Sequence, residues 1–210
     1  PPRGFALTVN FPKWTNQLPK IAAIAVVVAG ACVTGIVWYY FSPRFTDVGY
    51  APKQPVAYSH QLHAGQMGMD CRYCHTSVEE GPHANVPPTQ TCMNCHKSVR
   101  TDRSEIQKLT AAYESGDAIE WEKVHLLPDY AYFNHAAHVN AGVGCVSCHG
   151  RIDQMEVVRQ VEPLNMGWCL ECHRNPEPHL RPVSEVTNMD YVHDPALAKA
   201  RTEQVNPPTP

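Results

Sequence analysis

The sequence has no run of lysine or arginine residues, and its formal net charge is -3. It therefore lacks the concentrated positive charge that binds nucleic-acid phosphates, and nucleic acid is excluded as a partner. Only one cysteine, Cys32, lies outside four short cysteine motifs, so nothing remains for an intramolecular disulfide framework if those motifs have another use. With 19 prolines and 12 glycines, the chain favours irregular backbone, and long helices should be scarce after the N-terminal part.

One apolar run is present, from Ile21 to Phe41, and it contains 21 residues without a charge or a proline. A helix of this length spans roughly 30 Å, the thickness of the hydrocarbon core of a bilayer, so we expect one membrane crossing. Trp14 precedes the run and the segment 38–40 (WYY) ends it, as is typical of aromatic rings at a membrane interface. Within the run, we expect Cys32 to be a buried small hydrophobic residue.

The basic residues around the run indicate its orientation. Three of them, Arg3, Lys13 and Lys20, precede it, whereas Arg44 and Lys53 follow it. This weak positive-inside bias predicts a cytoplasmic N-terminus and an external C-terminal part. The alternatives are a cleaved signal peptide, which has a shorter apolar core, and a lipoprotein box ending at the single cysteine of the run, after which nine more apolar residues follow.

The pattern Cys-x-x-Cys-His occurs four times, as CRYCH, CMNCH, CVSCH and CLECH. In c-type attachment the two thiols form thioethers with haem vinyl groups, and the adjacent histidine binds the iron on one face. We therefore predict four covalently bound heme c groups. The thioether residues are Cys71, Cys74, Cys92, Cys95, Cys145, Cys148, Cys169 and Cys172. The proximal iron ligands are His75, His96, His149 and His173.

Zinc is the competing interpretation of these cysteines. The first four have the spacing Cys-x2-Cys-x17-Cys-x2-Cys of a zinc ribbon, and the second four match it with x20 in the middle. A ribbon, however, gives no reason for a histidine after every second cysteine, and only 12 of the 210 residues are histidine. The histidines therefore favour haem, which also suits an exported domain, because covalent attachment takes place on the outer side of bacterial membranes.

Two stretches of the sequence resemble each other. Tyr58–His75 (YSHQLHAGQMGMDCRYCH) and Phe133–His149 (FNHAAHVNAGVGCVSCH) each combine an aromatic residue, His-x-x-His, a glycine-containing stretch and a motif. A second motif follows each, so we interpret the pattern as two duplicated dihaem units. Histidines three residues apart cannot both bind one iron in trans, so each His-x-x-His should serve two neighbouring haems. The predicted distal ligands are His60, His63, His135 and His138.

Other side chains are weaker candidates for binding iron. A lone histidine is more often a surface residue than a ligand, but histidine is also a common metal ligand. The possible additional ligands are His83, His125, His179 and His193. Methionine sulfur can bind haem iron, although packing against porphyrin edges is the simpler interpretation. The methionines concerned are Met67, Met69 and Met166.

The predicted fold class is mainly α and irregular, with one N-terminal transmembrane helix followed by a multihaem cytochrome c domain of two dihaem units. Roughly 140 residues for four haems are too few to build a large apolar core, so porphyrin should supply much of it. The expected segments are a cytoplasmic segment at 1–20, a transmembrane helix at 21–41, a linker at 42–55, a first dihaem unit at 56–100, a connector at 101–131, a second dihaem unit at 132–194 and an extended tail at 195–210.

The connector should contain a helix from Asp102 to Tyr113. Asp102 and Glu105 have the spacing of a capping box, and Ile106, Leu109 and Tyr113 would lie along one stripe. Gly116 should end the helix.

The segments HANVPPTQTCMNCH, VHLLPDYAYFNHAAH and EPLNMGWCLECHRNPEPH together resemble the ActA-type multihaem cytochrome c subunit of alternative complex III, a quinol-oxidising membrane assembly. The resemblance, which runs from the apolar run to about residue 180, implies a periplasmic haem domain related to class III cytochromes, anchored in a bacterial inner membrane. It implies as partners membrane-embedded quinol-oxidising subunits, an iron-sulfur subunit, a monohaem cytochrome c subunit and a soluble electron acceptor or terminal oxidase. Members usually carry five haems, whereas four motifs predict four here, with a fifth possible only through spare histidines such as His83, His125 or His179.

The expected role is that of a non-enzymatic electron-transfer subunit. The alternative is a stand-alone quinol dehydrogenase similar to the NapC/NrfH family, in which the first haem lies close to the membrane. Here Cys71 comes about thirty residues after the apolar run, which disfavours that alternative. Haem-based nitrite or peroxide chemistry needs an iron with an open position, and the eight histidines outside the motifs are enough to fill every iron.

Overall fold

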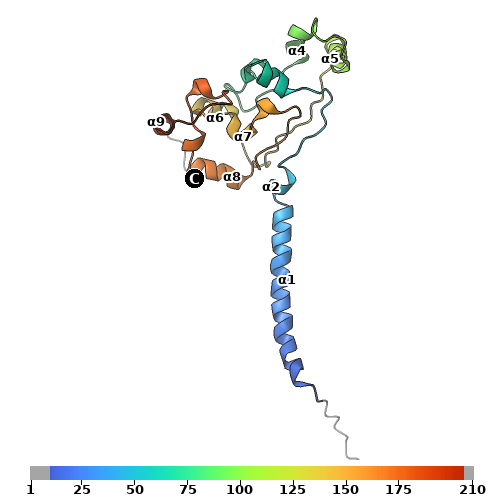
Figure 1. Cartoon of the computed structure of the whole chain (residues 1–210), viewed down its shortest axis with the longest axis vertical. Coiled ribbons are helices and arrows are strands. Elements are labelled where there is room, and N and C mark those ends of the chain that lie inside the picture. Colours follow the sequence, from blue (N-terminus) through green and yellow to red (C-terminus); the bar gives the residue numbers. More distant parts are fainter. Residues whose placement is uncertain (1–9, 206–210) are drawn as a thin grey trace, which may run out of the picture. The chain divides into compact units, whose positions relative to one another are not determined.

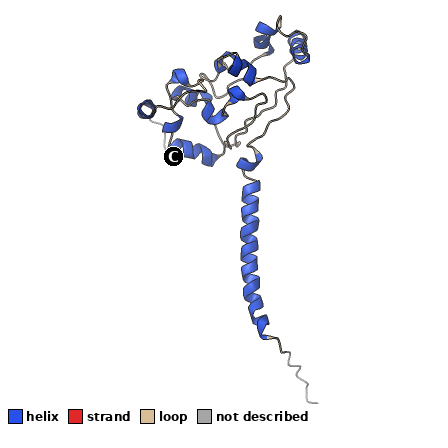
Figure 2. Ribbon diagram, in the orientation of Figure 1, coloured by secondary structure: helices blue, strands red, loops and turns tan. Residues whose placement is uncertain are grey.

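The computed structural model describes residues 10–205, which fall into two units that divide after Phe45 (Figure 1). Between residues 10 and 205 the backbone forms helices and irregular segments and no strand (Figure 2). A single isolated bridge pairs Val143 with Leu180 in that range. The prediction of a mainly α and irregular fold is therefore confirmed.

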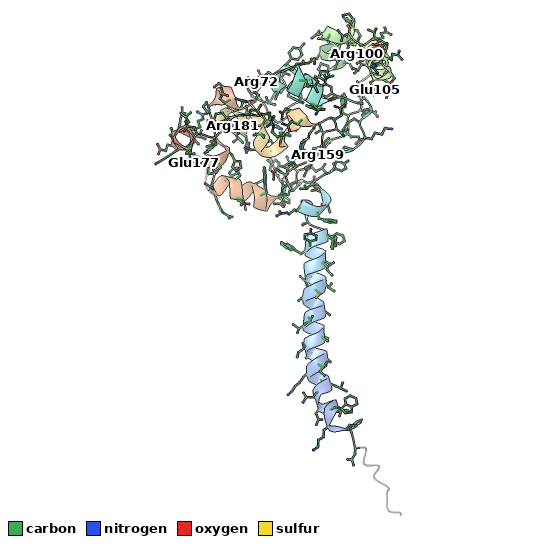
Figure 3. All side chains as sticks on the ribbon, in the orientation of Figure 1. Arg72, Arg100, Glu105, Arg159, Glu177 and Arg181 are labelled. Atoms are coloured by element: carbon green, nitrogen blue, oxygen red, sulfur yellow. The ribbon has the colours of Figure 1, made fainter. Side chains whose placement is uncertain are left out.

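The first unit consists of a short 3-10 helix, η1 (Lys13–Gln17), and the long helix α1 (Leu18–Tyr40). Helix α1 begins three residues before the predicted start and has a proline in its first turn. Proline is tolerated there because the backbone N–H that it lacks would have no partner within the helix. No residue of α1 is buried, and its side chains point outwards along its whole length (Figure 3). Cys32, which we expected to be buried, is exposed on this helix. Among the described residues this one helix is long and apolar enough to cross a membrane.

The short helix α2 (Pro43–Thr46) lies at the division between the units. The α-helices of the second unit are α3 (Cys71–Cys74), α4 (Thr89–His96), α5 (Ser104–Ser115), α6 (His135–Ala141), α7 (Val146–His149), α8 (Met166–Arg174) and α9 (Pro195–Val205). The other helical turns are the π-helix η2 (Gln61–Gln66) and the 3-10 helices η3 (Ile152–Gln154), η4 (Glu177–His179) and η5 (Val183–Glu185). Most of these helices are one or two turns long, as the proline and glycine content predicts.

A small apolar cluster joins α4 to α5, which lie side by side in Figure 1. Met93 of α4 packs with Ile106 and Leu109 of α5, and Val56 closes the cluster. The sequence predicted that Ile106 and Leu109 lie on one stripe of this helix, and both are buried in the cluster. Arg100 and Glu105 are labelled beside this pair of helices, far from Glu177 within the same unit (Figure 3).

The predicted capping box of α5 does not form. The helix begins at Ser104, and the carboxylate of Glu105 instead accepts from the backbone N–H of Ala57 at 2.8 Å and pairs with Lys108 at 2.7 Å. A contact 48 residues away thus replaces the local one. The predicted stop is confirmed, because Gly116 ends the helix with φ of 78°, a left-handed conformation that favours glycine.

The segment predicted as a linker, 42–55, is in its later part bound to the second unit. The backbone N–H of Gly49 donates to the carbonyl of Gln160 at 2.8 Å, and the N–H of Gln160 donates to the carbonyl of Tyr50 at 3.0 Å. Gln54 bonds through its side-chain amide to the backbone of Glu122 in both directions. The extended-linker expectation is therefore wrong for residues 49–54, because long-range backbone pairing replaces solvation.

The side chain of Gln160 is fully buried, and both ends of its amide are satisfied. Its Oε1 accepts from the N–H of Leu126 at 2.8 Å, and its Nε2 donates to the carbonyl of Glu162 at 3.0 Å. Burying a polar group is tolerated only when it is hydrogen-bonded, so this residue fixes the segment at Leu126 in place.

The segment 195–205, which we predicted as an extended tail, forms helix α9. Asp194 caps it by accepting from the N–H groups of Ala196 and Leu197, and Ala198 is fully buried. Arg201 donates through Nε to the carbonyl of Ala141 at the end of α6. Tertiary contacts therefore stabilise a helix that lacks apolar periodicity, while residues 206–210 of the predicted tail lie outside the described residues.

Gly142, which ends α6, allows two backbone segments to approach closely. It has φ of 93°, and an added Cβ would lie 2.3 Å from the carbonyl oxygen of Arg181. We expect Gly142→Ala to lower the free energy of unfolding by about 2–4 kcal/mol, from left-handed strain plus overpacking. Gly116→Ala is the matched control, because Gly116 has φ of 78° with nothing within 4 Å of the added Cβ. Denaturant unfolding of both variants should show the smaller loss for Gly116→Ala, and equal losses would contradict the argument.

Candidate haem-binding sites

All four Cys-x-x-Cys-His motifs lie on short helices. Side chains cap two of these helices at their N-termini. Asp70 caps α3 by accepting from the backbone N–H of Arg72, and Asn165 caps α8 by accepting from the N–H of Trp168. A helical turn brings residues three positions apart to one face, so both cysteines of a motif can reach one edge of a planar ring. The nine cysteines of the chain are all free of disulfides.

Each motif histidine faces one histidine of a His-x-x-His segment. An imidazole nitrogen lies about 2 Å from a bound metal and about 1.1 Å from its ring centre, so two imidazoles in trans on one iron have centroids about 6.2 Å apart. The observed centroid distances are 6.4 Å for His60 and His75, 6.2 Å for His63 and His96, 6.5 Å for His135 and His149, and 6.1 Å for His138 and His173. All four pairs therefore leave the space that one iron requires.

Residues 56–100 and residues 132–194, called the two halves below, pair their histidines in the same way. In each His-x-x-His the first histidine faces the nearer motif with almost parallel rings, at interplanar angles of 3° and 11°. The second faces the more distant motif with crossed rings, at 62° and 71°. The two histidines of one segment are thus directed to two different motifs.

The positions of the rings fit a haem and not a zinc ribbon. A pair of imidazoles supplies only two ligands in trans, and a porphyrin supplies the four remaining nitrogens. A zinc ribbon needs four side chains around one metal. Within residues 10–205, no three or more His, Cys, Asp or Glu side chains gather where they could hold a metal ion.

Hydrogen bonds fix the ring nitrogens of most of these histidines. Nδ1 lies within 3.0 Å of a backbone carbonyl in five of them, so the proton belongs on Nδ1 and Nε2 is left free to bind a metal. The contacts are His63 to Ser59, His75 to Asn85, His96 to Val99, His135 to Pro82 and His138 to Asn134. His60 differs, because its Nδ1 is buried without a partner in the described part of the chain.

Burial keeps the imidazoles of His60 and His149 neutral. Desolvation lowers the pKa of His60 to about 4 and that of His149 to about 3, with neighbouring histidines adding to the effect. Both side chains are therefore uncharged at pH 7. Neutral imidazole is the form that binds metals.

An aromatic ring supports each His-x-x-His in the same way. Tyr58 stacks on His63 at 4.5 Å and meets His60 edge-on at 4.8 Å. Phe133 stacks on His138 at 4.5 Å and meets His135 edge-on at 4.8 Å. The aromatic residue is part of the pattern that the two similar stretches share in the sequence. Its contacts with both histidine rings are seen only in the structure.

The first motifs of the two halves are in contact. A hydrogen bond between the thiols of Cys71 and Cys145 raises the pKa of Cys145 and lowers that of Cys71. Thr187 donates to Asp70 at 2.9 Å, while the N–H of Cys145 donates to the carbonyl of Val186 at 2.9 Å. One short segment, 186–187, therefore connects the two motifs.

The contacts between the halves are reciprocal. The first turn of α6 bonds to the loop after the first motif, where the N–H of Ala136 donates to the carbonyl of Gly81 at 3.1 Å. The start of η2 bonds to the loop after the third motif, where the N–H of Gln61 donates to the carbonyl of Met155 at 3.0 Å. Each His-x-x-His segment is thus anchored to the opposite half.

The remaining candidate ligands have different surroundings. His83 and His193 are exposed, and His179 is half-buried on η4. His125 lies against His149 and is not directed to any other motif histidine. Of the methionines, Met67 and Met166 are exposed. With two imidazoles at every motif, no sulfur ligand is required.

Comparison with known proteins relates part of the chain to multihaem cytochromes c. Residues 43–122, which contain the first two motifs, match the Class III cytochrome C family, whose members bind c-type haem covalently. Over 107 residues the chain is 36% identical to the multiheme cytochrome c subunit of menaquinone reductase from Nitratidesulfovibrio vulgaris. The match covers 50% of this chain and 50% of that relative, so the chain spans about half the length of the curated relative it matches. The expected relation to class III cytochromes is confirmed for the matched residues.

Proposed function

We propose that this protein is a membrane-anchored, tetrahaem electron-transfer subunit built from two duplicated dihaem units. The observation that carries the proposal is the spacing of four histidine pairs at 6.1–6.5 Å, one at each attachment motif. The same pairing rule, the same aromatic support and the reciprocal contacts between halves support a duplication.

Bound haem would supply reversible one-electron chemistry at iron. The residues of the chain would attach each group through two thiols and direct two imidazoles towards it, and a contact at Nδ1 fixes the ring in six of the eight histidines. Because every motif histidine faces a second histidine, the chain would leave no iron position for a substrate, which supports electron transfer rather than catalysis. The contact between Cys71 and Cys145 makes the two units neighbours at their first motifs.

The partners we propose are quinol-linked. The relative from Nitratidesulfovibrio vulgaris is a subunit of a menaquinone reductase, and the sequence resembles subunits of alternative complex III. We infer membrane-embedded quinol-oxidising subunits, an iron-sulfur subunit, a monohaem cytochrome c subunit and a soluble electron acceptor. Helix α1 would anchor the chain in a bacterial inner membrane with a cytoplasmic N-terminus and a periplasmic haem domain. Isolated from these partners, the chain should not oxidise a quinol analogue, whereas unaided oxidation would favour a NapC/NrfH-like dehydrogenase.

Haem stoichiometry tests the function directly. We expect four haems per chain by pyridine haemochrome assay, with four haem-bearing peptides by mass spectrometry. The double variant Cys71→Ala/Cys74→Ala should contain three, because one pair of thioethers is lost. Cys32→Ala, which changes the one cysteine outside the motifs, should retain four. A count of five, or fewer than four in the unaltered chain, would contradict the proposal.

A further inference from the structure

His149 differs from other motif histidines in what its second ring nitrogen contacts. Nδ1 of His75 lies 2.7 Å from the carbonyl of Asn85, and Nδ1 of His96 lies 3.0 Å from the carbonyl of Val99. Nδ1 of His149 instead lies 3.1 Å from Nε2 of His125, and the two rings meet edge-on with centroids 4.3 Å apart. A side chain thus occupies the place that a peptide carbonyl takes at those two motifs.

The direction of this hydrogen bond follows from the proposed function, on which the inference rests. The ring of His149 faces His135 at 6.5 Å, so its Nε2 is the nitrogen that would bind iron. Its proton must then be on Nδ1, which donates to Nε2 of His125. His125 in turn keeps its own proton on Nδ1.

His125 is held in place for this role. The adjacent Leu126 donates its N–H to the fully buried side chain of Gln160 at 2.8 Å, which fixes the backbone next to His125. An acceptor held in this way orients its partner ring at little entropic cost.

The kind of acceptor also has an electronic effect. An imidazole nitrogen is a stronger base than a peptide carbonyl oxygen, so it draws the Nδ1 proton of His149 further from its ring. The ring then donates more electron density through Nε2, which stabilises the oxidised iron and lowers its potential. We propose that His125 is the positioning residue of His149, and that it lowers the potential of the iron at the third motif.

The test compares three variants of the full-length, haem-loaded protein by redox titration with optical and EPR detection. His125→Leu removes the acceptor, so one of the four midpoint potentials should rise and three should stay unchanged. His125→Gln offers an amide oxygen, the acceptor that other motif histidines have, and should reverse part of the shift. His193→Leu changes an exposed histidine and should alter no potential.

Each outcome decides the inference separately from the proposed function. Four haems with all four potentials unchanged in His125→Leu would overturn the role of His125 and leave the proposed function intact. A high-spin iron in His125→Leu would also overturn it, because His125 would then be an iron ligand. A rise of equal size in both His125 variants would show that packing, and not the acceptor, sets the potential. Fewer than four haems in the unaltered protein would remove the proposed function itself.

Discussion

The haem-free chain is expected to show no cooperative unfolding of residues 46–205. Among the described residues only ten hydrophobic side chains are buried, in small groups such as the cluster between α4 and α5. At about 1.5–3 kcal/mol each, these side chains do not balance the roughly 1–2 kcal/mol that ordering each residue costs. Porphyrin must therefore supply the missing apolar core.

The experiment compares the full-length protein made with and without covalent haem attachment, in detergent. Near-ultraviolet circular dichroism during heating should give a sigmoidal transition for the haem-loaded protein and a gradual change for the haem-free chain. The far-ultraviolet signal of α1 should persist in both, because a long apolar helix in detergent is stable without haem. A cooperative near-ultraviolet melt of the haem-free chain would show that the protein core suffices.

Removing one distal histidine is expected to convert one haem in four from low-spin to high-spin. In His135→Ala the iron proposed at the third motif would lose the ring whose centroid lies 6.5 Å from that of His149. That iron should then be five-coordinate, since no other described ring faces His149 at this distance. EPR should show a high-spin signal from one haem equivalent, and carbon monoxide should bind one haem per chain.

Two further variants make the second test specific. His60→Ala should give the same result at the first motif, because His60 and His75 have the same nearly parallel arrangement. His193→Ala should remain fully low-spin, since His193 is exposed and is not directed at a motif histidine. A fully low-spin spectrum of His135→Ala would contradict the assigned pairing.

Local patterns predicted the elements that depend on neighbouring residues. The apolar run gave a helix within three residues of its predicted start, and Gly116 ended α5 as expected. The start of α5 was predicted two residues early, because Glu105 bonds to Ala57 and Lys108 and not back to Asp102. A capping rule cannot include a partner 48 residues away.

Longer-range contacts explain the remaining differences. The C-terminal segment lacks the apolar periodicity of a surface helix, yet Ala198 is buried and Arg201 bonds to the end of α6. His125 gave no signal that set it apart from His83 or His179, because its role depends on lying against His149. The predicted domain boundaries and iron ligands themselves remain predictions for the experiments above.

The sequence by itself determined where haem can be attached and where a membrane can be crossed. Two thiols and an imidazole within five residues, or 21 residues without a charge or a proline, are local properties that need no fold to be recognised. Only the tertiary structure decided which histidine faces which motif, that Cys71 contacts Cys145, and that Nδ1 of His149 lies against His125. Those relations join residues far apart along the chain, and their geometry depends on the packing of all the segments between them.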